Sequence, residues 1–288
     1  MSYLGTLAAI AVCALMAWIG STTSVAEVGP IPLYAFCCML ALVIQWIVFI
    51  PSFISKSEYV FDLTGAVTYI TVVIVAMWVS ENTDIRSLII ASCVITWSIR
   101  LGLFLFLRVV REKSDKRFRP IRGNFGLFLM TFTLQGLWVV LSLAAGLVAM
   151  TSTKALEPDL FLVIGAILWV VGFILEVTAD EQKKKFRKNP ANADRFIRSG
   201  LWRWSQHPNY FGEITLWTGI AVMAYPILEG WQFATLISPV FVTILLTRIS
   251  GTRMLDNLAR RKWGKDPDYQ EYIKTTSKLI PFPPRQNS

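Results

Sequence analysis

The sequence predicts an all-α, polytopic integral membrane protein built as a bundle of about seven or eight transmembrane helices. Of its 288 residues, 54% are hydrophobic and only 16% are charged, whereas a soluble domain carries about 25% charged residues. A helix needs about 20 mainly apolar residues to cross the hydrocarbon core. Helices are expected rather than barrel strands because the runs lack polar–apolar alternation. The candidate segments are residues 3–20, 31–50, 60–79, 87–110, 125–149, 159–180, 208–226 and 231–250.

Positive charge is concentrated in three stretches, which sets the expected orientation. The formal net charge is +9, and the basic residues gather at 111–122, at 181–203 and from Arg248 onward. The connections at 80–84 and 152–159 carry almost none. This asymmetry predicts an even number of spans with both termini in the cytoplasm. Topology and contact with anionic membrane lipids explain the charges, and no nucleic-acid-binding motif accompanies them, so no nucleic-acid partner is expected.

The chain is expected to form a single membrane domain over residues 1–288. Its first apolar run lacks a basic leader and a small-residue cleavage site, so it is read as a retained span. The linkers are short and no internal repeat is evident. Four cysteines lie within apolar runs without metal-ligand spacing and are expected to be free thiols: Cys13, Cys37, Cys38 and Cys93.

The single histidine of the chain, His207, excludes several kinds of enzyme. Membrane oxygenases need many histidines to hold iron, and structural zinc needs clusters of cysteine or histidine. No G-x-S-x-G elbow, P-loop or G-x-G-x-x-G turn is present. No metal is therefore expected, and an enzyme of this sequence is expected to use an organic cofactor.

Polar residues inside the third and fourth apolar runs mark a candidate site, because ionisable groups at membrane depth usually serve function. Asp62 and Tyr69 lie seven residues apart and share a helix face with Gly65, which lets another helix or a flat ligand approach closely. Arg100 lies well inside the fourth run and needs an acid or a phosphate nearby. Asp62 is a candidate partner, and a purely structural ion pair is the alternative.

The sixth apolar run carries a second polar face. Glu176 and Asp180 are four residues apart, and Lys184 and Arg187 continue this face toward the cytoplasm. Acidic groups within the run and basic groups at its rim suit a ligand with hydroxyl or amide donors as well as phosphates. The alternative is a helix end whose basic side chains snorkel to the interface.

The stretch GLWRWSQHPNYFGE at 200–213 predicts a loop that enters a helix at Pro208. Asn209 and Glu213 are four residues apart on one face, and Gly212 leaves room beside them. The free N–H groups of a helix start favour an anion such as a pyrophosphate.

His207 is then expected beside phosphates, with Trp202 and Trp204 as stacking surfaces. Equally open is a structural interpretation, in which His207 caps the helix and the tryptophans belong to an interfacial belt.

Six stretches in fixed order resemble the steroid 5-alpha-reductase-like membrane reductases, particularly their bacterial members. They are DLTG, WSIRLGLFLFLRVVREKSDKRF, LEVTADEQKKKF, GLWRWSQHPNYFGE, LLTRISG and YQEYIKTTSKLIPFPP. The resemblance implies accessory helices at 1–57 and a reductase core at 58–284, with the cofactor-binding half at 159–284. The HP-Y-G string alone also resembles isoprenylcysteine carboxyl methyltransferases, which bind S-adenosylmethionine with it.

The resemblance further implies NADPH among the C-terminal helices, with its adenosine end reaching the cytoplasm. It implies hydride transfer to an activated carbon–carbon double bond of a lipid-soluble enone, such as a 3-oxo-Δ4 steroid or an enoyl lipid. Arginine-rich stretches favour the 2′-phosphate of NADPH, because guanidinium binds phosphate bidentately. The expected cofactor-binding residues are Arg100, Arg108, Arg111, Glu176, Asp180, Lys184, Arg187, Trp202, His207, Asn209, Tyr210, Glu213, Arg248, Tyr272 and Lys274.

The catalytic acid departs from the family pattern. The tyrosine that polarises the substrate carbonyl in steroid reductases corresponds here to Trp97 or its neighbour, which cannot donate a phenolic proton. The expected catalytic residues are therefore Tyr69, Asp62 and Glu58, with Tyr69 as the acid, aided by Asp62 or Arg100.

Two other functions stay open. An S-adenosylmethionine-dependent methyltransferase would use the same C-terminal pocket, although it has less need of polar third and fourth helices. A transporter or lipid-binding scaffold would use the intramembrane charges, but matched pairs of Gly/Pro-broken helices are absent from the sequence. The protein is expected in a membrane, either the bacterial inner membrane or the endoplasmic reticulum of a eukaryote, with the cofactor entrance facing the cytoplasm. For the reductase, the expected partner is a hydrophobic small-molecule substrate.

Overall fold

The computed structural model describes residues 2–82, 84–112, 118–249 and 251–284, and it confirms the helical membrane bundle. Within those residues, seven helical segments are long and apolar enough to cross a membrane. Residues 113–117 of the first basic stretch lie outside the described residues. The seven segments are α1 (Ser2–Gly20), α2 (Leu33–Ile54), α3 (Phe61–Ser80), α4 (Ile85–Glu112), α5 (Phe125–Thr151), α6 (Leu160–Lys188) and Gly230–Ile249.

The eighth expected segment is α7 (Pro208–Ala224), a helix of 17 residues that is shorter than the other seven. It begins at Pro208, as the sequence predicts. The segment Gly230–Ile249 combines a 3₁₀ turn with α8 (Ile237–Ile244) and a π-helical stretch. Two further helices follow, α9 (Thr252–Trp263) and α10 (Pro267–Thr275). The orientation in the membrane stays a prediction.

The chain divides into two compact units. The first unit comprises Met1–Val163 and Ile220–Ser238, and the second comprises Ile164–Gly219 and Pro239–Ser288. The single domain expected from the sequence, with its core at 58–284, stays a prediction.

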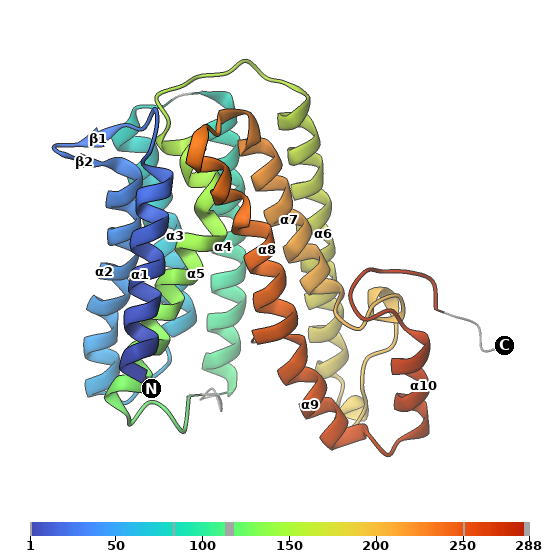
Figure 1. Ribbon diagram of the computed structural model, residues 1–288. Coiled ribbons are helices and arrows are strands. Elements are labelled where there is room, and N and C mark those ends of the chain that lie inside the picture. Colours follow the sequence, from blue (N-terminus) through green and yellow to red (C-terminus); the bar gives the residue numbers. More distant parts are fainter. Residues whose placement is uncertain (1, 83, 113–117, 250, 285–288) are drawn as a thin grey trace. The chain divides into compact units, whose positions relative to one another are not determined.

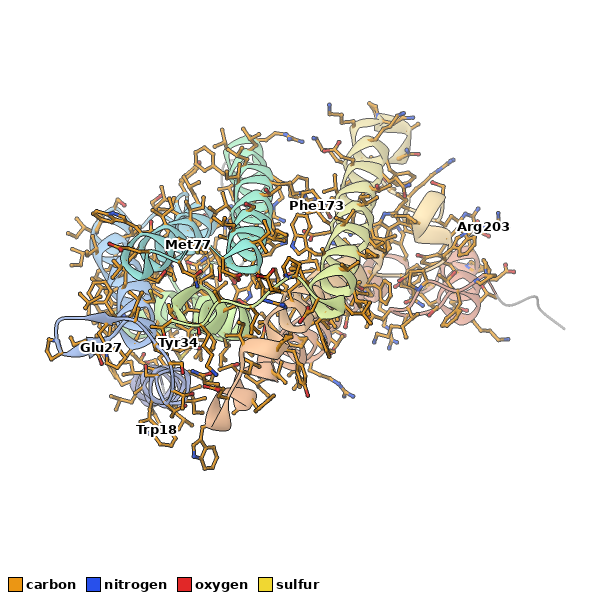
Figure 2. All side chains as sticks on the ribbon, turned by 90° about the horizontal axis from the view of Figure 1, so that it is seen from above. Trp18, Glu27, Tyr34, Met77, Phe173 and Arg203 are labelled. Atoms are coloured by element: carbon orange, nitrogen blue, oxygen red, sulfur yellow. The ribbon has the colours of Figure 1, made fainter. Side chains whose placement is uncertain are left out.

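The first unit is organised around α5. Helices α1, α2, α3 and α4 all pack against it, and Figure 1 shows it among them. Each residue from Val139 to Thr151 is buried, and side chains fill the spaces between these helices (Figure 2). A short antiparallel hairpin of β1 (Glu27–Val28) and β2 (Ile31–Pro32) lies at the end of the bundle opposite the N terminus (Figure 1).

The second unit depends on a close contact between α6 and α7. A Cβ atom added at Gly172 would lie 2.5 Å from the backbone nitrogen of Leu216, and one added at Gly212 would lie 2.6 Å from that of Glu176. Gly219 repeats the contact against the carbonyl oxygen of Gly165, at 2.5 Å. Small residues allow such backbone contact, which drives helix association in lipid. The room beside Gly212 that the sequence predicts is therefore taken up by α6.

Gly172→Ala is expected to destabilise the second unit, because its methyl group would meet backbone atoms that cannot turn aside. Overpacking of this kind costs about 1–3 kcal/mol. The control is Gly123→Ala, whose added Cβ meets nothing within 4 Å. Thermal unfolding in detergent, followed by tryptophan fluorescence, measures both. Equal unfolding midpoints for the two variants would show that the α6–α7 contact does not contribute measurably to stability.

Candidate cofactor and substrate sites

A cluster of polar side chains lies along the α6–α7 contact. Glu176, Asp180 and Glu213 are buried, with 2%, 8% and 7% of their surfaces exposed. Asn209 donates from Nδ2 to Oδ1 of Asp180 at 3.2 Å. Buried carboxylates require hydrogen-bonding or charged partners, and the structure brings the residues predicted on two separate helices to this one contact.

The basic end of α6 is more exposed. Lys184 forms an ion pair with Glu181 at 2.7 Å, and Arg187 is exposed. These positions place positive charge beyond the buried acids on the same helix, as the sequence predicts.

His207 has one satisfied and one unsatisfied ring nitrogen. Its Nε2 lies 2.9 Å from Oδ1 of Asp256, and its ring stacks on that of Tyr210 with centroids 5.5 Å apart. Nδ1 is buried without a hydrogen-bond partner. Because the carboxylate of Asp256 is an acceptor, Nε2 carries a proton, so a neutral His207 presents Nδ1 as an acceptor. The side chain thus points to Asp256, and only the backbone carbonyl serves the first turn of α7, accepting from Phe211 at 3.2 Å.

Asp256 is a partner that sequence reasoning missed. Burial alone would raise the pKa of its carboxyl, but hydrogen bonds from His207 and Lys278 outweigh burial and hold that pKa below its ordinary value. The Lys278 ammonium lies 3.1 Å from Oδ2. The one available signal was an isolated acid among the basic residues of α9, LDNLARRKW.

Trp202 and Tyr272 hold the loop before α7. The indole of Trp202 donates to the carbonyl of Ala179 at 3.0 Å, and the Lys183 ammonium lies 4.3 Å from its ring centroid. The hydroxyl of Tyr272 donates to the carbonyl of Trp202 at 2.7 Å. Burial, reinforced by Tyr269, raises the pKa of Tyr272, so this donor stays protonated near neutral pH. Trp202 is therefore packed against α6, whereas Trp204 is 46% exposed.

A cavity of about 660 Å³ lies beside the His207 partner in the second unit. Asp256, Arg260, Lys274 and Lys278 give its wall several charges. Glu176, Asp180, Asn209 and Glu213 are not among its lining residues. Arg248 is exposed on the π-helical stretch.

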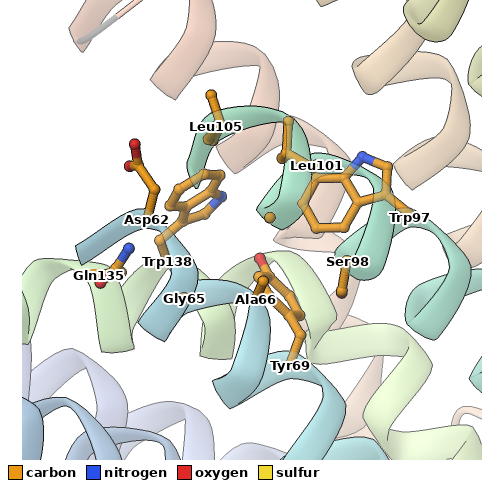
Figure 3. A pocket seen from close by; sticks show the side chains of 11 residues that line it. Asp62, Gly65, Ala66, Tyr69, Trp97, Ser98, Leu101, Leu105, Gln135 and Trp138 are labelled. Carbon is orange, nitrogen blue, oxygen red and sulfur yellow. The ribbon is translucent and has the colours of Figure 1, made fainter. Parts of the chain in front are cut away.

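The first unit contains a separate pocket, which two predicted catalytic residues line. Asp62 and Tyr69 line it from α3, and the ring centroid of Tyr69 lies 5.3 Å from that of Trp97 of α4 (Figure 3). The Tyr69 hydroxyl forms a hydrogen bond with the Ser142 hydroxyl. Asp62 lies 3.7 Å from the guanidinium of Arg108.

Glu58, the third predicted catalytic residue, lies outside the lining of this pocket. It is 2% exposed and pairs with Arg122 at 3.2 Å. Arg100 is half-buried on α4, 5.3 Å from the ring of Phe104, and Arg111 is exposed near the end of the same helix. These arginines belong to the first unit, so their joint use with the α6–α7 cluster is a proposal.

Three further lining residues, Ser98, Gln135 and Trp138, were missed by sequence reasoning. Gln135 gave a signal, since it is an isolated amide within the apolar run of α5. The absent side chain at Gly65 leaves space for it: an added Cβ would lie 2.7 Å from Nε2 of Gln135. The close approach predicted at Gly65 is thus made by a side chain of α5.

Asp256→Asn is expected to lower the melting temperature at neutral pH, because it removes the charge that His207 and Lys278 contact. A carboxyl whose pKa is lower in the folded state stabilises the fold above its unfolded pKa of about 3.9 and loses this effect as the pH falls through the folded value. The advantage of the wild type should therefore shrink only below about pH 4. Melting curves across pH test this, with the exposed Asp268→Asn as control. An advantage that vanishes already between neutral pH and pH 5 contradicts it.

Comparison with known proteins gives a family. Residues 48–276 match the family described as "Protein of unknown function (DUF1295)". The chain is 29% identical over 119 residues to "3-oxo-5-alpha-steroid 4-dehydrogenase 1" of Bos taurus, covering 41% of this chain and 40% of that protein. It is 27% identical over 183 residues to "Steroid 5-alpha-reductase DET2" of Gossypium hirsutum, covering 61% and 62% of the two chains.

A third relative is named as a methyltransferase and not as a reductase. The "Probable O-methyltransferase ustE" of Ustilaginoidea virens is 32% identical over 75 residues, or 26% of either chain. This chain thus spans less than two thirds of the length of each of these three relatives. No solved structure matches. Because the family match covers most of the sequence, the chain belongs to the DUF1295 family, and it is similar to the steroid 5-alpha-reductases.

Proposed function

We propose that this protein is an NADPH-dependent membrane reductase that saturates the activated double bond of a lipid-soluble enone, either steroid-like or an enoyl lipid. The observation that carries the proposal is the buried cluster of Glu176, Asp180, Asn209 and Glu213 at the α6–α7 contact. The names of the bovine and cotton relatives support the reaction class.

The chemistry of this cluster fits a nicotinamide dinucleotide. Buried carboxylates accept hydrogen bonds from ribose hydroxyls and from a carboxamide, and the orphaned Nδ1 of His207 is available to one more polar group. Lys184 and Arg187 supply positive charge for phosphates. As the resemblance implies, we assign Arg100, Arg108 and Arg111 to the diphosphate and adenosine, and Tyr272 and Lys274 to further cofactor contacts.

A reduced nicotinamide held by the α6–α7 cluster would supply the hydride for the β carbon of the enone; negative charge would develop on the carbonyl oxygen, and a proton from water would be added at the α carbon. The residues of the first unit would bind the carbonyl end. We assign the acid to Tyr69, which lines the pocket, and an orienting role to Asp62, which pairs with Arg108. Glu58 is occupied by Arg122 and receives no role in this step.

The positive charge of the second unit supports a cytoplasmic cofactor entrance. The stretch 181–203 and the tail after Arg248 carry most of its basic residues, and such loops favour the cytoplasmic side. Free NADPH would then reach the α6–α7 cluster from the cytoplasm, while the substrate enters from lipid.

Methyl transfer is the second candidate, and the match to the O-methyltransferase is the observation that favours it. Purification in detergent followed by denaturation separates the two. Release of a reduced nicotinamide nucleotide supports the reductase, whereas release of S-adenosylmethionine without nucleotide would replace it with a methyltransferase.

Asn209→Ala and Glu213→Ala, with Glu176→Gln as a third variant, are expected to lower NADPH retention at least about tenfold, since hydrogen bonds to charged groups contribute about 1.5–3 kcal/mol. The matched control on α6 is Glu181→Gln, whose side chain is 55% exposed. Nucleotide released per protein, together with the melting temperature, is measured. Full NADPH retention in all three variants would show that the cluster stabilises the fold and does not bind the cofactor.

Tyr69→Phe is expected to lower turnover of an enone substrate about 10²–10⁴-fold, the usual contribution of a positioned acid. NADPH retention should not change, because Tyr69 lies in the first unit's pocket. Tyr34→Phe is the control, since Tyr34 is also buried in that unit but does not line the pocket. Single-turnover oxidation of the bound nucleotide after mixing with substrate gives the rate. Equal rates in both variants would exclude Tyr69 as the acid.

A further inference from the structure

The pocket of the first unit contains three buried polar atoms that have no hydrogen-bond partner. They are Oγ of Ser98, Oε1 of Gln135 and Nε1 of Trp138. Ser98 is 1% exposed and Gln135 is 4% exposed. Buried polar groups in native proteins are almost always satisfied, so three orphans around one pocket indicate a missing polar guest.

The size of the pocket limits that guest. The pocket has a volume of about 20 Å³, and about 10–15 Å³ is enough for one water. The pocket therefore takes a single oxygen atom and not a whole lipid. The surrounding Ala66, Leu101 and Leu105 are apolar, as a lipid-soluble molecule carrying that oxygen would require.

The direction of the hydrogen bonds identifies the oxygen as an acceptor. An indole N–H only donates, so Trp138 requires an acceptor. The Tyr69 proton is already used: Ser142 donates its single proton to the carbonyl of Trp138 at 2.6 Å, so Tyr69 must donate to Ser142. Ser98 can donate as well, and the Gln135 amide presents oxygen or nitrogen after a half turn. Figure 3 shows Ser98 of α4 and Trp138 of α5 among the side chains that line the pocket.

We infer that Trp138, through its N–H, and Ser98, through its O–H, hold the carbonyl end of the substrate. This inference rests on the proposed function and names the groups that position its enone. Neutral donors fixed on helices stabilise negative charge that develops on a carbonyl oxygen, because they need no reorganisation when the charge appears.

The test uses full-length protein in detergent and two probes, a 3-oxo-Δ4 steroid and a long-chain enoyl ketone, each with an isotope-labelled carbonyl carbon. Infrared difference spectra report hydrogen bonds to that carbonyl as a shift of its stretching band to lower frequency. Wild type should show the shift with at least one probe. Trp138→Phe and Ser98→Ala should each lose part of it and weaken binding about three- to tenfold, the value of one neutral hydrogen bond.

Trp169→Phe is the matched control. Its indole Nε1 is likewise buried without a partner, but Trp169 lies on α6 outside the pocket. It should keep both the shift and the affinity. Ser98→Ala removes only one oxygen atom, so it tests the inference even where Trp138→Phe loses stability.

Three results overturn the inference: no binding or no shift of either probe in wild type, an unchanged shift in both pocket variants, or lower melting temperatures with an unchanged shift. The last result would mean that the pocket holds a structural water. The amount of NADPH bound in the same samples tests the proposed function independently of the carbonyl site. A carbonyl shift without nucleotide would refute the reductase and leave the carbonyl site in place.

Discussion

The contact between α6 and α7 at Gly172, Gly212 and Gly219 is the constraint on which the candidate cofactor site depends. Lipid supplies no hydrophobic force between helices, so close association requires surfaces that let backbones touch. Each glycine provides such a surface, since an added Cβ would come within 2.5–2.6 Å of the facing backbone. The same contact sets Gly212 against Glu176 and brings Asn209 to Asp180. The contact that packs α6 against α7 therefore also brings the buried acidic side chains together.

The C-terminal segment fixes the loop that leads into α7. Gln206 donates from Nε2 to the carbonyls of Ile273 and Thr276, at 3.2 and 2.8 Å, and Ser205 donates to that of Leu279 at 2.7 Å. Asp256 holds the ring of His207 from α9. These bonds join residues that are 49 to 74 positions apart, so the loop conformation depends on the docking of α9, α10 and the chain after them. A ligand at the start of α7 would meet a loop already held by these bonds.

Local features of the sequence predicted what local physics determines. Hydrophobic length located the spans, Pro208 located the start of α7, and the four-residue spacing of Glu176 and Asp180 placed both acids on α6. The partner of His207 could not be predicted, because Asp256 reaches it only after α9 folds back. The pocket residues Ser98 and Trp138 depend on the rotation of α4 and α5 about their axes, which hydropathy leaves undetermined in uniformly apolar helices. Gly212 was expected to leave room beside Asn209 and Glu213, but α6 packs against it.

The hydroxyls of Tyr69 and Ser142 carry one proton each, and this limits when Tyr69 could donate a hydrogen bond to the substrate in the proposed reaction. Ser142 donates to the carbonyl of Trp138 and accepts from Tyr69. Turning the Tyr69 proton to a neutral substrate carbonyl would exchange one neutral hydrogen bond for another, with little gain. Once negative charge develops on that oxygen, a charge-assisted bond is roughly twice as strong, so the exchange becomes favourable. Trp138 and Ser98 would hold the carbonyl beforehand, and Tyr69 would turn toward it only as the charge appears. In the proposed reaction, this arrangement would stabilise the transition state more than the bound substrate, which is the condition for catalysis.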